Sequence, residues 1–457
     1  MFLRIKKQFT TTQMIAYGFL AAILVGSFLL MLPIASRNGN ATPYVDALFT
    51  STSAICVTGL MTVTTIEHWN LFGQIVILAL IQFGGLGVIT FTTSLLLVLH
   101  KRITLKERIL IQDAYNLSTL GGLVKLTIKI IKGTLLVEGI GAVFFAFQFV
   151  PEFGLLPGIW KSVFHSVSAF CNAGIDLIGP SSFTPYVGNV IINLTTMTLI
   201  VVGGIGFPVW WDILRVIKTH TIEKLNIKHM FQKLQLHSKI AISMTFVLII
   251  GGAIILFLLE FHNSKTIGDL PLGQKVMASF FQSITTRTAG FNTISQQDLR
   301  DPSALLCILL MFIGGSPSGT AGGIKTVTLV VLIFTTVAVI KGKNDVEIFN
   351  RKITSDIYKK ALAITCFSTF ILFLSTMTLS IVENVNLIDI LYETSSAIGT
   401  VGLTRGLTPN LSVIGKLIII STMYLGRIGP ITLALMFNAK RTRGKERSLP
   451  EEQLLIG

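Results

Sequence analysis

Four short phrases that each end in glycine recur along this chain of 457 residues. The glycines are Gly59, Gly174, Gly290 and Gly402, at intervals of 115, 116 and 112 residues. Glycine adopts a positive φ without steric cost, so its carbonyl can turn towards an axis that other residues avoid. Carbonyl oxygens from four such segments can surround a dehydrated cation and replace its water shell. The spacing therefore predicts a four-part site that coordinates a cation.

The last residues of each phrase are the candidate ion ligands, through their backbone carbonyls. They are Cys56, Val57, Thr58 and Gly59; Cys171, Asn172, Ala173 and Gly174; Thr288, Ala289 and Gly290; and Gly399, Thr400, Val401 and Gly402. Arg287 stands directly before the third set. Because a cation directed into a cation site would block it, we expect Arg287 to point away. It would brace the loop through hydrogen bonds to carbonyls or to a carboxylate.

The elements that position these phrases have the same order in each repeat. In the first, an apolar stretch (residues 14–34) is followed by a short Ser/Thr-rich segment (about 43–54), the phrase, and a second apolar stretch (71–99). A short helix between two spanning helices predicts a re-entrant pore helix, because non-helical backbone at membrane depth requires surrounding protein or a water-filled cavity. We therefore expect four repeats around one axis, with boundaries at residues 1–110, 111–230, 231–345 and 346–440, and a cytoplasmic tail at 441–457.

The composition places these repeats in a membrane. The chain is 51% hydrophobic and 13% charged, whereas soluble domains carry about 25% charged residues. Apolar stretches near the length that spans a bilayer cover residues 14–34, 71–99, 134–150, 190–216, 240–259, 360–382 and 414–437. Residues 1–34 also resemble the start of a signal peptide, but the apolar run is longer than a typical signal core. We expect an all-α integral membrane protein, with eight transmembrane helices in a pseudo-fourfold arrangement.

The charge distribution predicts orientation. The chain has 37 Lys and Arg against 22 Asp and Glu, a net charge of +15. Basic residues gather in residues 1–10, 100–132, 215–239, 341–360 and 440–447, between less basic loops. Since cytoplasmic loops retain Lys and Arg, both termini are expected to be cytoplasmic. Charges at helix ends favour contact with lipid head groups or an acidic cytosolic partner and not with nucleic acid.

A second glycine cluster recurs in each returning helix and expands in the third repeat. The expanded segment supplies the candidate gate residues, which are Gly314, Gly315, Ser316, Ser318, Gly319, Thr320, Gly322, Gly323 and Lys325. Each glycine costs about 1 kcal/mol in a helix and proline about 3 kcal/mol, so this segment should form a polar loop inside the membrane. In the first two repeats, close helix packing explains the glycines equally well. A phosphate-binding loop is excluded because Ile324 separates Gly323 from Lys325.

Arg427 replaces a glycine of this cluster in the fourth repeat. A charge near the bilayer centre costs about 2.5–3.5 kcal/mol and normally faces a watery interior. We expect Arg427 to face the pore as an electrostatic barrier, as part of the gate. A buried pair with a carboxylate is the alternative.

Other chemistry finds little support in the sequence. The cysteines stand alone, as packing residues would: Cys56, Cys171, Cys307 and Cys366. The seven histidines form no metal-binding motif, and no Ser/His/Asp set is evident, so we expect no enzyme activity and no cofactor. Asp46, Asp212 and Glu393 are expected near helix ends, where they cap, pair or attract cations.

These features together resemble the Trk/Ktr/HKT superfamily of potassium transporters. Specific phrases are residues 286–291 (TRTAGF) and 322–326 (GGIKT). The chain is most similar to the bacterial Ktr membrane subunit (KtrB-like), which begins at the first repeat without an additional helix pair. The resemblance implies that the four glycines select K+ over Na+. It also implies a gate formed by residues 314–325, with Arg427 opposing it.

The resemblance further implies the assembly and its location. Ktr-type subunits form homodimers in the bacterial plasma membrane, on a cytosolic ring of nucleotide-binding regulatory subunits (RCK-type, KtrA-like). K+ would be the transported ion and Na+ a candidate activator. The alternative mechanism is an alternating-access cation symporter, which also uses broken helices near the midplane.

Overall fold

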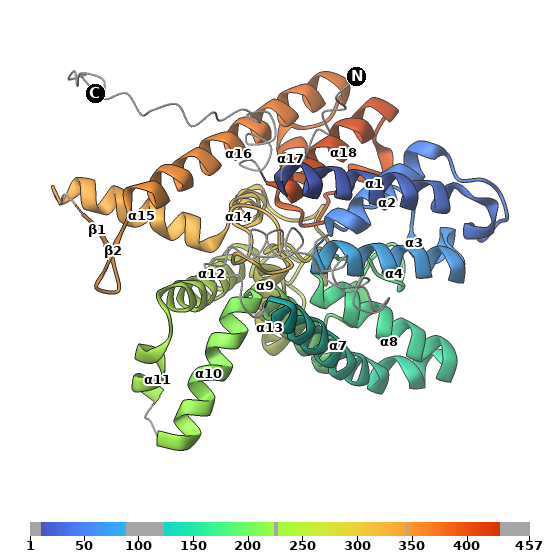
Figure 1. Cartoon of the computed structure of the whole chain (residues 1–457). Coiled ribbons are helices and arrows are strands. Elements are labelled where there is room, and N and C mark those ends of the chain that lie inside the picture. The colour runs from blue at the N-terminus through green and yellow to red at the C-terminus, as the bar shows by residue number, and fades with distance from the viewer. Residues whose placement is uncertain (1–10, 88–122, 224–226, 344, 430–457) are drawn as a thin grey trace, which may run out of the picture.

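The computed structural model describes residues 11–87, 123–223, 227–343 and 345–429. Its helices follow one another around a common centre in chain order (Figure 1). Helices α1, α2 and α4 lie on the right of this view, α7 and α8 below them, α10 to α12 at the lower left, and α16 to α18 across the top. The predicted boundaries at 110 and 440 lie outside the described residues, while the boundary at 230 falls within α11.

Each of the four predicted units supplies the same three kinds of helix. The outer helices are α1 (Thr11–Met31), α7 (Leu123–Phe153), α12 (Leu236–Glu260) and α16 (Ser355–Val382). The short helices are α2 (Tyr44–Cys56), α8 (Leu155–Phe170), α13 (Leu272–Thr285) and α17 (Leu387–Gly399). The returning helices are α4 (Leu71–Leu86), α9 (Val190–Gly204), α14 (Asp301–Phe312) and α18 (Val413–Ile428). The predicted short segment at 43–54 is therefore α2, which extends two residues further.

The remaining elements connect these helices. They are η1 (Pro33–Ala35), α3 (Thr65–His68), η2 (Thr184–Tyr186), α10 (Phe207–Glu223), α11 (Ile227–Lys233), α15 (Thr326–Ile340), β1 (Val346–Ile348), β2 (Arg351–Ile353) and η3 (Thr408–Asn410). The two strands correct the all-α prediction. They pair antiparallel, with Ile348 opposite Arg351. Phe349 and Asn350 between them have φ values of 49° and 58°, which suits the tight two-residue turn of a twisted hairpin.

The returning helices are shorter than predicted. Helix α4 ends at Leu86 and α18 at Ile428, each followed by a glycine with a φ of 80° or more (Gly87, 80°; Gly429, 85°). Residues 88–99 and 430–437 of the predicted spans lie outside the described residues. The predicted span 190–216 is broken instead: α9 and α10 meet at an angle of 98°. Gly206, with a φ of 95°, lies in this break.

Several helices have the length and composition of membrane spans. Within the described ranges, four qualify by themselves: Gln13–Met31, Val124–Phe153, Leu236–Glu260 and Ser355–Val382. The bent pair of α9 and α10 makes a fifth if it counts as one span. The prediction of eight spans is not confirmed by these residues, because the glycine clusters end the returning helices early.

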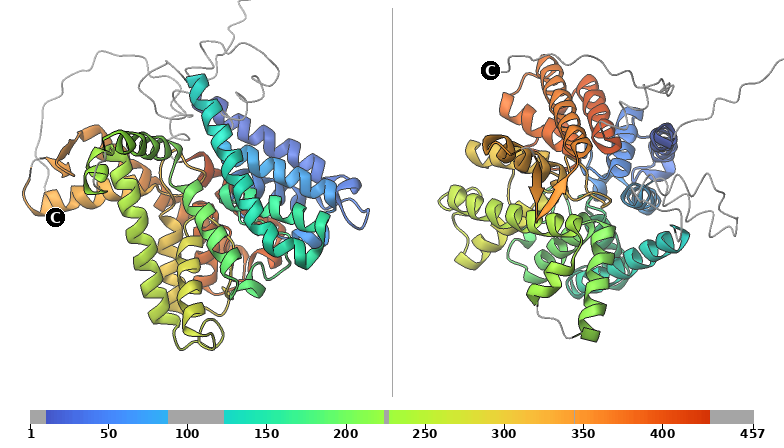
Figure 2. Two further views of the ribbon diagram at one scale, coloured as in Figure 1. Left: turned by 90° about the horizontal axis from the view of Figure 1, so that it is seen from below. Right: turned by 60° about the vertical axis from the view of Figure 1, so that its left-hand side comes forward.

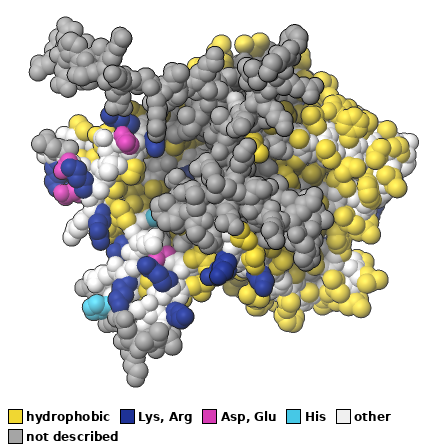
Figure 3. All heavy atoms as spheres, viewed as in Figure 1, with side chains coloured by type: hydrophobic (Ala, Val, Ile, Leu, Met, Phe, Trp, Pro, Cys, Tyr) yellow, Lys and Arg dark blue, Asp and Glu magenta, His cyan; other side chains and the backbone are white. Residues whose placement is uncertain are grey.

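Side chains on the outer helices have the polarity that a membrane requires. Leu136 and Phe147 on α7 are each 65% exposed, and Val247 on α12 is 62% exposed. Figure 3 shows hydrophobic side chains over the first and second units, and Lys and Arg side chains over α10, α11 and the hairpin. The hairpin lies on the opposite side of the molecule from α1 and α4 (Figure 2). The basic face is thus separate from the apolar one.

A serine–glycine contact joins the outer and short helices in three units. Ser51 donates to the Ile23 carbonyl at 2.8 Å, Ser166 to Glu138 at 2.6 Å and Ser283 to Ile249 at 2.8 Å. In each outer helix a glycine stands three residues after the accepting residue: Gly26, Gly141 and Gly252. A Cβ on any of these glycines would contact the serine Oγ. The small residue lets the helices approach closely, as is common in membranes.

Gly252→Val is expected to lower the free energy of unfolding by about 1–3 kcal/mol, because the added atoms would press on Ser283 and Leu310. Thermal unfolding in detergent measures the change. The matched control is Gly251→Val, since a Cβ at Gly251 meets no atom within 4 Å. Equal midpoints for the two variants would contradict the proposed packing role.

Candidate functional site

The four glycine phrases meet at the centre of the molecule. We call them loops 1 to 4, which are residues 56–59, 171–174, 288–290 and 399–402. A Cβ atom placed on each glycine would contact a carbonyl oxygen of the next loop: Gly59 that of Ala173 (2.5 Å), Gly174 that of Ala289, Gly290 that of Val401 (2.6 Å) and Gly402 that of Thr58. The contacts run from loop 1 to 2, 3, 4 and back to 1. The loops therefore form a closed ring in which only glycine fits.

The backbone conformation of the ring repeats with the same fourfold pattern. The glycine φ values are 97°, 66°, 86° and 95° in chain order. Two residues before each glycine, Val57, Asn172, Thr288 and Thr400 also have positive φ values, between 51° and 71°. Non-glycine residues rarely adopt this conformation, and such strained residues cluster at functional sites. The sequence predicted the glycines but gave no signal for the preceding residues.

Hydrogen bonds from each loop run back to its own short helix. The N–H groups of Thr58, Ala173 and Val401 each donate to a serine carbonyl at 2.8 Å, those of Ser53, Ser168 and Ser396. The N–H groups of Gly59 and Gly402 donate to Ser53 Oγ and Ser396 Oγ at 3.0 Å. In the described part of the chain, no donor binds the carbonyls of Thr58, Ala173, Ala289 or Val401. The ring thus presents carbonyl oxygens that remain available to a ligand.

A cavity of about 210 Å³ lies beside the ring. All four glycines line it, together with Asp176, Asn292, Thr404 and other residues that follow the loops. Carbonyl oxygens without a donor, beside a cavity, are the kind of ligands that can replace the hydration shell of a cation.

Residues 314–325 pack against loops 2 and 4. Ile313 and Ile324 form a parallel β-bridge, so the start and the end of the segment lie side by side. Thr320 Oγ1 donates to the Phe170 carbonyl at 3.2 Å, next to loop 2. A Cβ on Gly322 would contact Thr400 Oγ1 of loop 4. The predicted polar loop therefore exists, and it is packed directly against the ring.

The same segment also contacts the break between α9 and α10. Ser316 N–H donates to the Gly204 carbonyl at 2.9 Å, and Thr320 N–H to the Gly203 carbonyl at 3.2 Å. Phe207 N–H donates in return to the Ser318 carbonyl at 3.1 Å. The broken helix thus provides the backbone groups that hold the segment.

Arg427 binds this segment through carbonyl oxygens. Its Nη1 donates to the Thr320 carbonyl at 2.5 Å, and its Nη2 donates to the Gly84 carbonyl at the end of α4. Among the described residues it has no carboxylate partner, so the alternative of a buried ion pair is not what the structure contains. Carbonyls at helix ends carry partial negative charge and suit a guanidinium. Lys325 Nζ similarly donates to the Ala321 carbonyl at 2.6 Å.

Two predictions about side chains need correction. Arg287 is buried and its Nη2 donates to Thr245 Oγ1 of α12 at 3.3 Å. Among the residues that the structure describes, its side-chain partner is thus a hydroxyl of the outer helix, and not a carbonyl or a carboxylate. Glu393 lies in the middle of α17 and is fully buried, not near the end of the helix.

The other sequence candidates lie away from the ring or beside it. Asp46, in the first turn of α2, pairs with Lys416 at 2.6 Å, as predicted for a helix-end carboxylate. Asp212 pairs with Arg215 at 2.6 Å, but it lies inside α10 beyond the first turn, so its predicted place near a helix end is wrong. The four cysteines are unpaired; Cys366 is exposed and the other three are buried. Among the described residues, no group of three His, Cys, Asp or Glu side chains could hold a metal ion.

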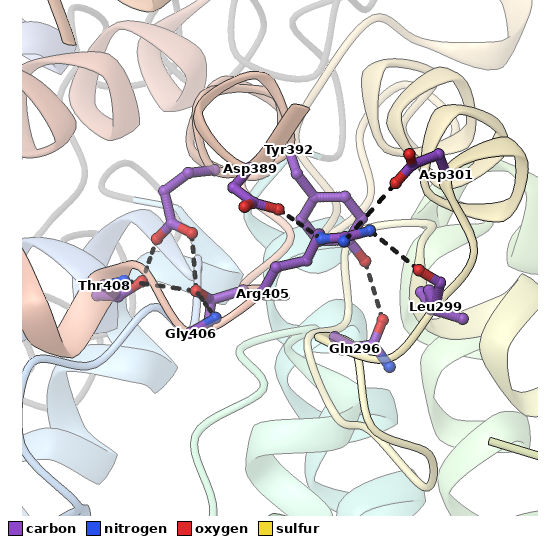
Figure 4. Close-up of polar contacts among 10 residues, drawn as sticks. Gln296, Leu299, Asp301, Asp389, Tyr392, Arg405, Gly406 and Thr408 are labelled. Carbon is purple, nitrogen blue, oxygen red and sulfur yellow. Dashed lines mark hydrogen bonds and ion pairs between the residues drawn. The ribbon is translucent and has the colours of Figure 1, made fainter. Parts of the chain in front are cut away.

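A polar cluster beyond loop 4 was missed by the sequence reasoning (Figure 4). Arg405 Nε pairs with Asp389 Oδ1 at 2.7 Å, and Arg405 Nη1 donates to the Leu299 carbonyl at 3.3 Å. Tyr392 Oη donates to Gln296 Oε1 at 2.9 Å. These contacts join the fourth unit to the third. The sequence contained one signal for this cluster: an arginine stands only three residues after a ring glycine, in a poorly basic loop.

Comparison with known proteins identifies the family of the chain. A family model described as a cation transport protein, TrkH, matches residues 3–446. The chain is 41% identical to the potassium/sodium uptake protein NtpJ of Enterococcus hirae, over 99% of both chains. It is 40% identical to the Ktr system potassium uptake protein B of Bacillus subtilis, over 98% of this chain and 97% of the other.

A solved structure shows the same fold. The crystal structure of the potassium transporter TrkH from Vibrio parahaemolyticus matches with a TM-score of 0.74 and 16% identity, over 95% of this chain and 86% of the other. The family match covers almost the whole chain, and the full-length relatives are transport proteins and not enzymes. The chain therefore belongs to the TrkH family of cation transport proteins.

Proposed function

We propose that this chain is the pore-forming membrane subunit of a K+ uptake system. The closed ring of four glycine loops, with its free carbonyls, carries the proposal. Two relatives of 40% and 41% identity are named as potassium and potassium/sodium uptake proteins. Oxygen ligands in a ring can replace the hydration shell of K+. K+ is the transported ion, and Na+ is a candidate activator or second substrate.

In this mechanism the four loops act as a selectivity filter. Residues 56–59, 171–174, 288–290 and 399–402 surround the ion path, and the cavity beside them collects hydrated cations. Positive φ values direct successive carbonyls in a way that an ordinary strand does not allow. Only the ring glycine is shared by all four loops, so fewer strong sites are expected than in a filter with two glycines per strand.

Residues 314–325 act as the gate in this proposal. The segment packs against loops 2 and 4, so ions that pass the ring meet it next. Arg427 holds the Thr320 carbonyl and places a positive charge beside the path. Displacement of the segment would open the path without moving the filter. Glycines give the segment the conformational freedom for such a change, and Ser318, with a φ of 58°, has a conformation that non-glycine residues rarely adopt.

The architecture and assembly follow the same proposal. The chain spans a bacterial plasma membrane eight times, in the four units given above, with both termini and the basic segments in the cytoplasm. It forms a homodimer on a ring of cytosolic nucleotide-binding regulatory subunits of the RCK type. Support comes from the basic face over α10, α11 and the hairpin and from relatives named as parts of Ktr systems.

An alternating-access symporter is the second candidate. The 98° break between α9 and α10 favours it, since carriers often bind ions at discontinuous helices. A ring of four similar loops fits a single continuous path better than two halves that move against each other. Unitary currents in a lipid bilayer distinguish the two, because a carrier turns over too slowly to produce them.

Growth of a K+-uptake-deficient bacterium at low K+ tests the proposed function. Expression of the chain, with a cytosolic regulatory partner, is expected to restore growth and K+ uptake. Expression without the partner tests the regulatory ring, because unregulated or absent uptake would reveal the partner's role. A correctly inserted chain that restores no uptake under either condition would contradict the proposal.

A further inference from the structure

Each short helix carries one polar side chain at an equivalent buried position behind its loop. It stands nine residues before the ring glycine in three units and eight residues before it in the third. The residues are Thr50, His165, Gln282 and Glu393, and all four are 0% exposed. Their identities differ although their positions correspond. The four units are therefore equivalent in backbone but not in this contact.

Three of these side chains hold the segment that follows their loop. Leu177 N–H donates to His165 Nε2 at 3.2 Å, while His165 Nδ1 faces the Lys161 carbonyl at 2.6 Å. These partners require the neutral tautomer with the proton on Nδ1. The side chains of Gln282 and Gln296 exchange two hydrogen bonds, at 2.7 and 3.0 Å.

The first unit lacks this contact. Within the described ranges, Thr50 Oγ1 has no hydrogen-bond partner. The second and third units use neutral groups, and the fourth uses a carboxylate. The hydrogen bonds that restrain the segment after each loop thus differ from unit to unit.

Glu393 makes two such contacts, both to threonines that follow loop 4. Its Oε2 accepts a hydrogen bond from Thr404 Oγ1 at 2.7 Å, and its Oε1 accepts one from Thr408 Oγ1. Each hydrogen bond of this kind contributes about 1 kcal/mol or more, so the pair restrains the segment from two points. Thr404 Oγ1 also accepts Gly406 N–H at 3.1 Å. A single buried carboxylate thereby fixes the turn that follows Gly402.

The held residue lies next to the ion path. Thr404 lines the cavity beside the ring, two residues after Gly402. Val401, which precedes Gly402, supplies the carbonyl that faces Gly290. Any change in the turn after Gly402 is therefore passed to the carbonyls of loop 4. Arg405 also restrains this turn, through its ion pair with Asp389 and its hydrogen bond to the Leu299 carbonyl (Figure 4).

We propose that Glu393 is a positioning residue that sets K+ affinity and selectivity by holding Thr404, and with it loop 4. The inference rests on the proposed K+ uptake function. Loop 4 is then the most rigid corner of the ring. Loop 1 is the most adaptable, because Thr50 Oγ1 behind it makes no hydrogen bond within the described ranges. Ion preference depends on the fixed corner, because a carbonyl that cannot move discriminates between ions of different size.

The test compares Glu393→Ala, Glu393→Gln and Thr404→Val in proteoliposome flux assays of K+ and Na+. Glu393→Ala and Thr404→Val are expected to raise the KM for K+ about tenfold and to lower the K+ over Na+ ratio, with Vmax within about twofold. Glu393→Gln should restore most of the affinity, because Oε1 can accept from Thr404 while Nε2 donates to Thr408. Thr50→Val is the matched control and should leave KM and the ratio within about twofold, since Thr50 Oγ1 has no partner in the described chain.

The outcomes distinguish the positioning role of Glu393 from an effect of its charge and from misfolding of a variant. Equal losses in Glu393→Gln and Glu393→Ala would overturn the inference, because charge and not position would then be responsible. Unchanged KM and ion ratio in both Glu393→Ala and Thr404→Val would also overturn it. If Glu393→Ala does not fold, Thr404→Val, which preserves side-chain shape, decides alone. Absence of K+ flux in the unmodified protein would contradict the proposed function itself, so the two failures are distinguishable.

Discussion

A Gly59→Ser variant is expected to lose most of its preference for K+ over Na+, by tenfold or more, and to bind K+ more weakly. Gly59 has a φ of 97°, and an added Cβ would lie 2.5 Å from the Ala173 carbonyl oxygen. A non-glycine residue in such a conformation costs about 1–2 kcal/mol before any contact is counted. Either loop 1 changes its backbone or the Ala173 carbonyl moves. K+ and Na+ fluxes in proteoliposomes, measured in competition, give the ratio.

Gly39→Ser is the matched control for backbone strain. Gly39 also has a positive φ, 69°, but a Cβ there meets no atom within 4 Å. This control variant should keep the ion ratio of the unmodified protein. A Gly59→Ser protein with unchanged selectivity would show that the ring carbonyls are not the selective element.

The second large effect is expected at Arg427, where Arg427→Gln should raise basal K+ flux roughly tenfold or more. The guanidinium donates to the Thr320 carbonyl of residues 314–325 and to the Gly84 carbonyl of α4. Charge-assisted hydrogen bonds of this kind contribute about 1.5–3 kcal/mol each, so their loss shifts the closed state strongly towards the open one. Flux without a regulatory partner is the measurement.

Arg427→Lys separates the two possible actions of this residue. Lysine keeps the charge but cannot reach two carbonyls with a planar fork. A latch predicts raised flux in the lysine variant, whereas an electrostatic barrier predicts low flux. Lys416→Met is the control, because Lys416 lies on the same helix and pairs with Asp46 at 2.6 Å, away from the segment. If Arg427→Gln leaves basal flux unchanged, residues 314–325 are not held closed by this arginine.

Much of the centre of the molecule could be predicted from the sequence. The glycine requirement is local, because positive φ and close approach of neighbouring loops leave a repeated signal in one chain. For the same reason the position of α2 and the break at residues 314–325 were predicted correctly.

The ends and partners of these elements could not be predicted in the same way. The apolar run at 190–216 continues across the break at Gly206, so hydropathy alone indicates one helix. The partner of Arg287 is Thr245, 42 residues earlier, and only the packing of α12 brings them together. The buried position of Glu393 was also not predicted. Its two threonine partners come after the loop and are therefore distant from it in the sequence. The corresponding position in the third unit is also one residue closer to the ring glycine, which obscures the repeat.

The closed ring has a consequence for the synthesis of the protein. Loop 4 completes the ring on both sides, since Gly290 faces Val401 and Gly402 faces Thr58. The first and last units are joined again where Tyr424 Oη donates to the Ala16 carbonyl at 2.9 Å. Until its last quarter enters the membrane, a nascent chain can therefore make only the contacts from loop 1 to loop 2 and from loop 2 to loop 3, and the ring stays open. The proposed ion path would then form in a single late step, which a prematurely terminated chain cannot reach.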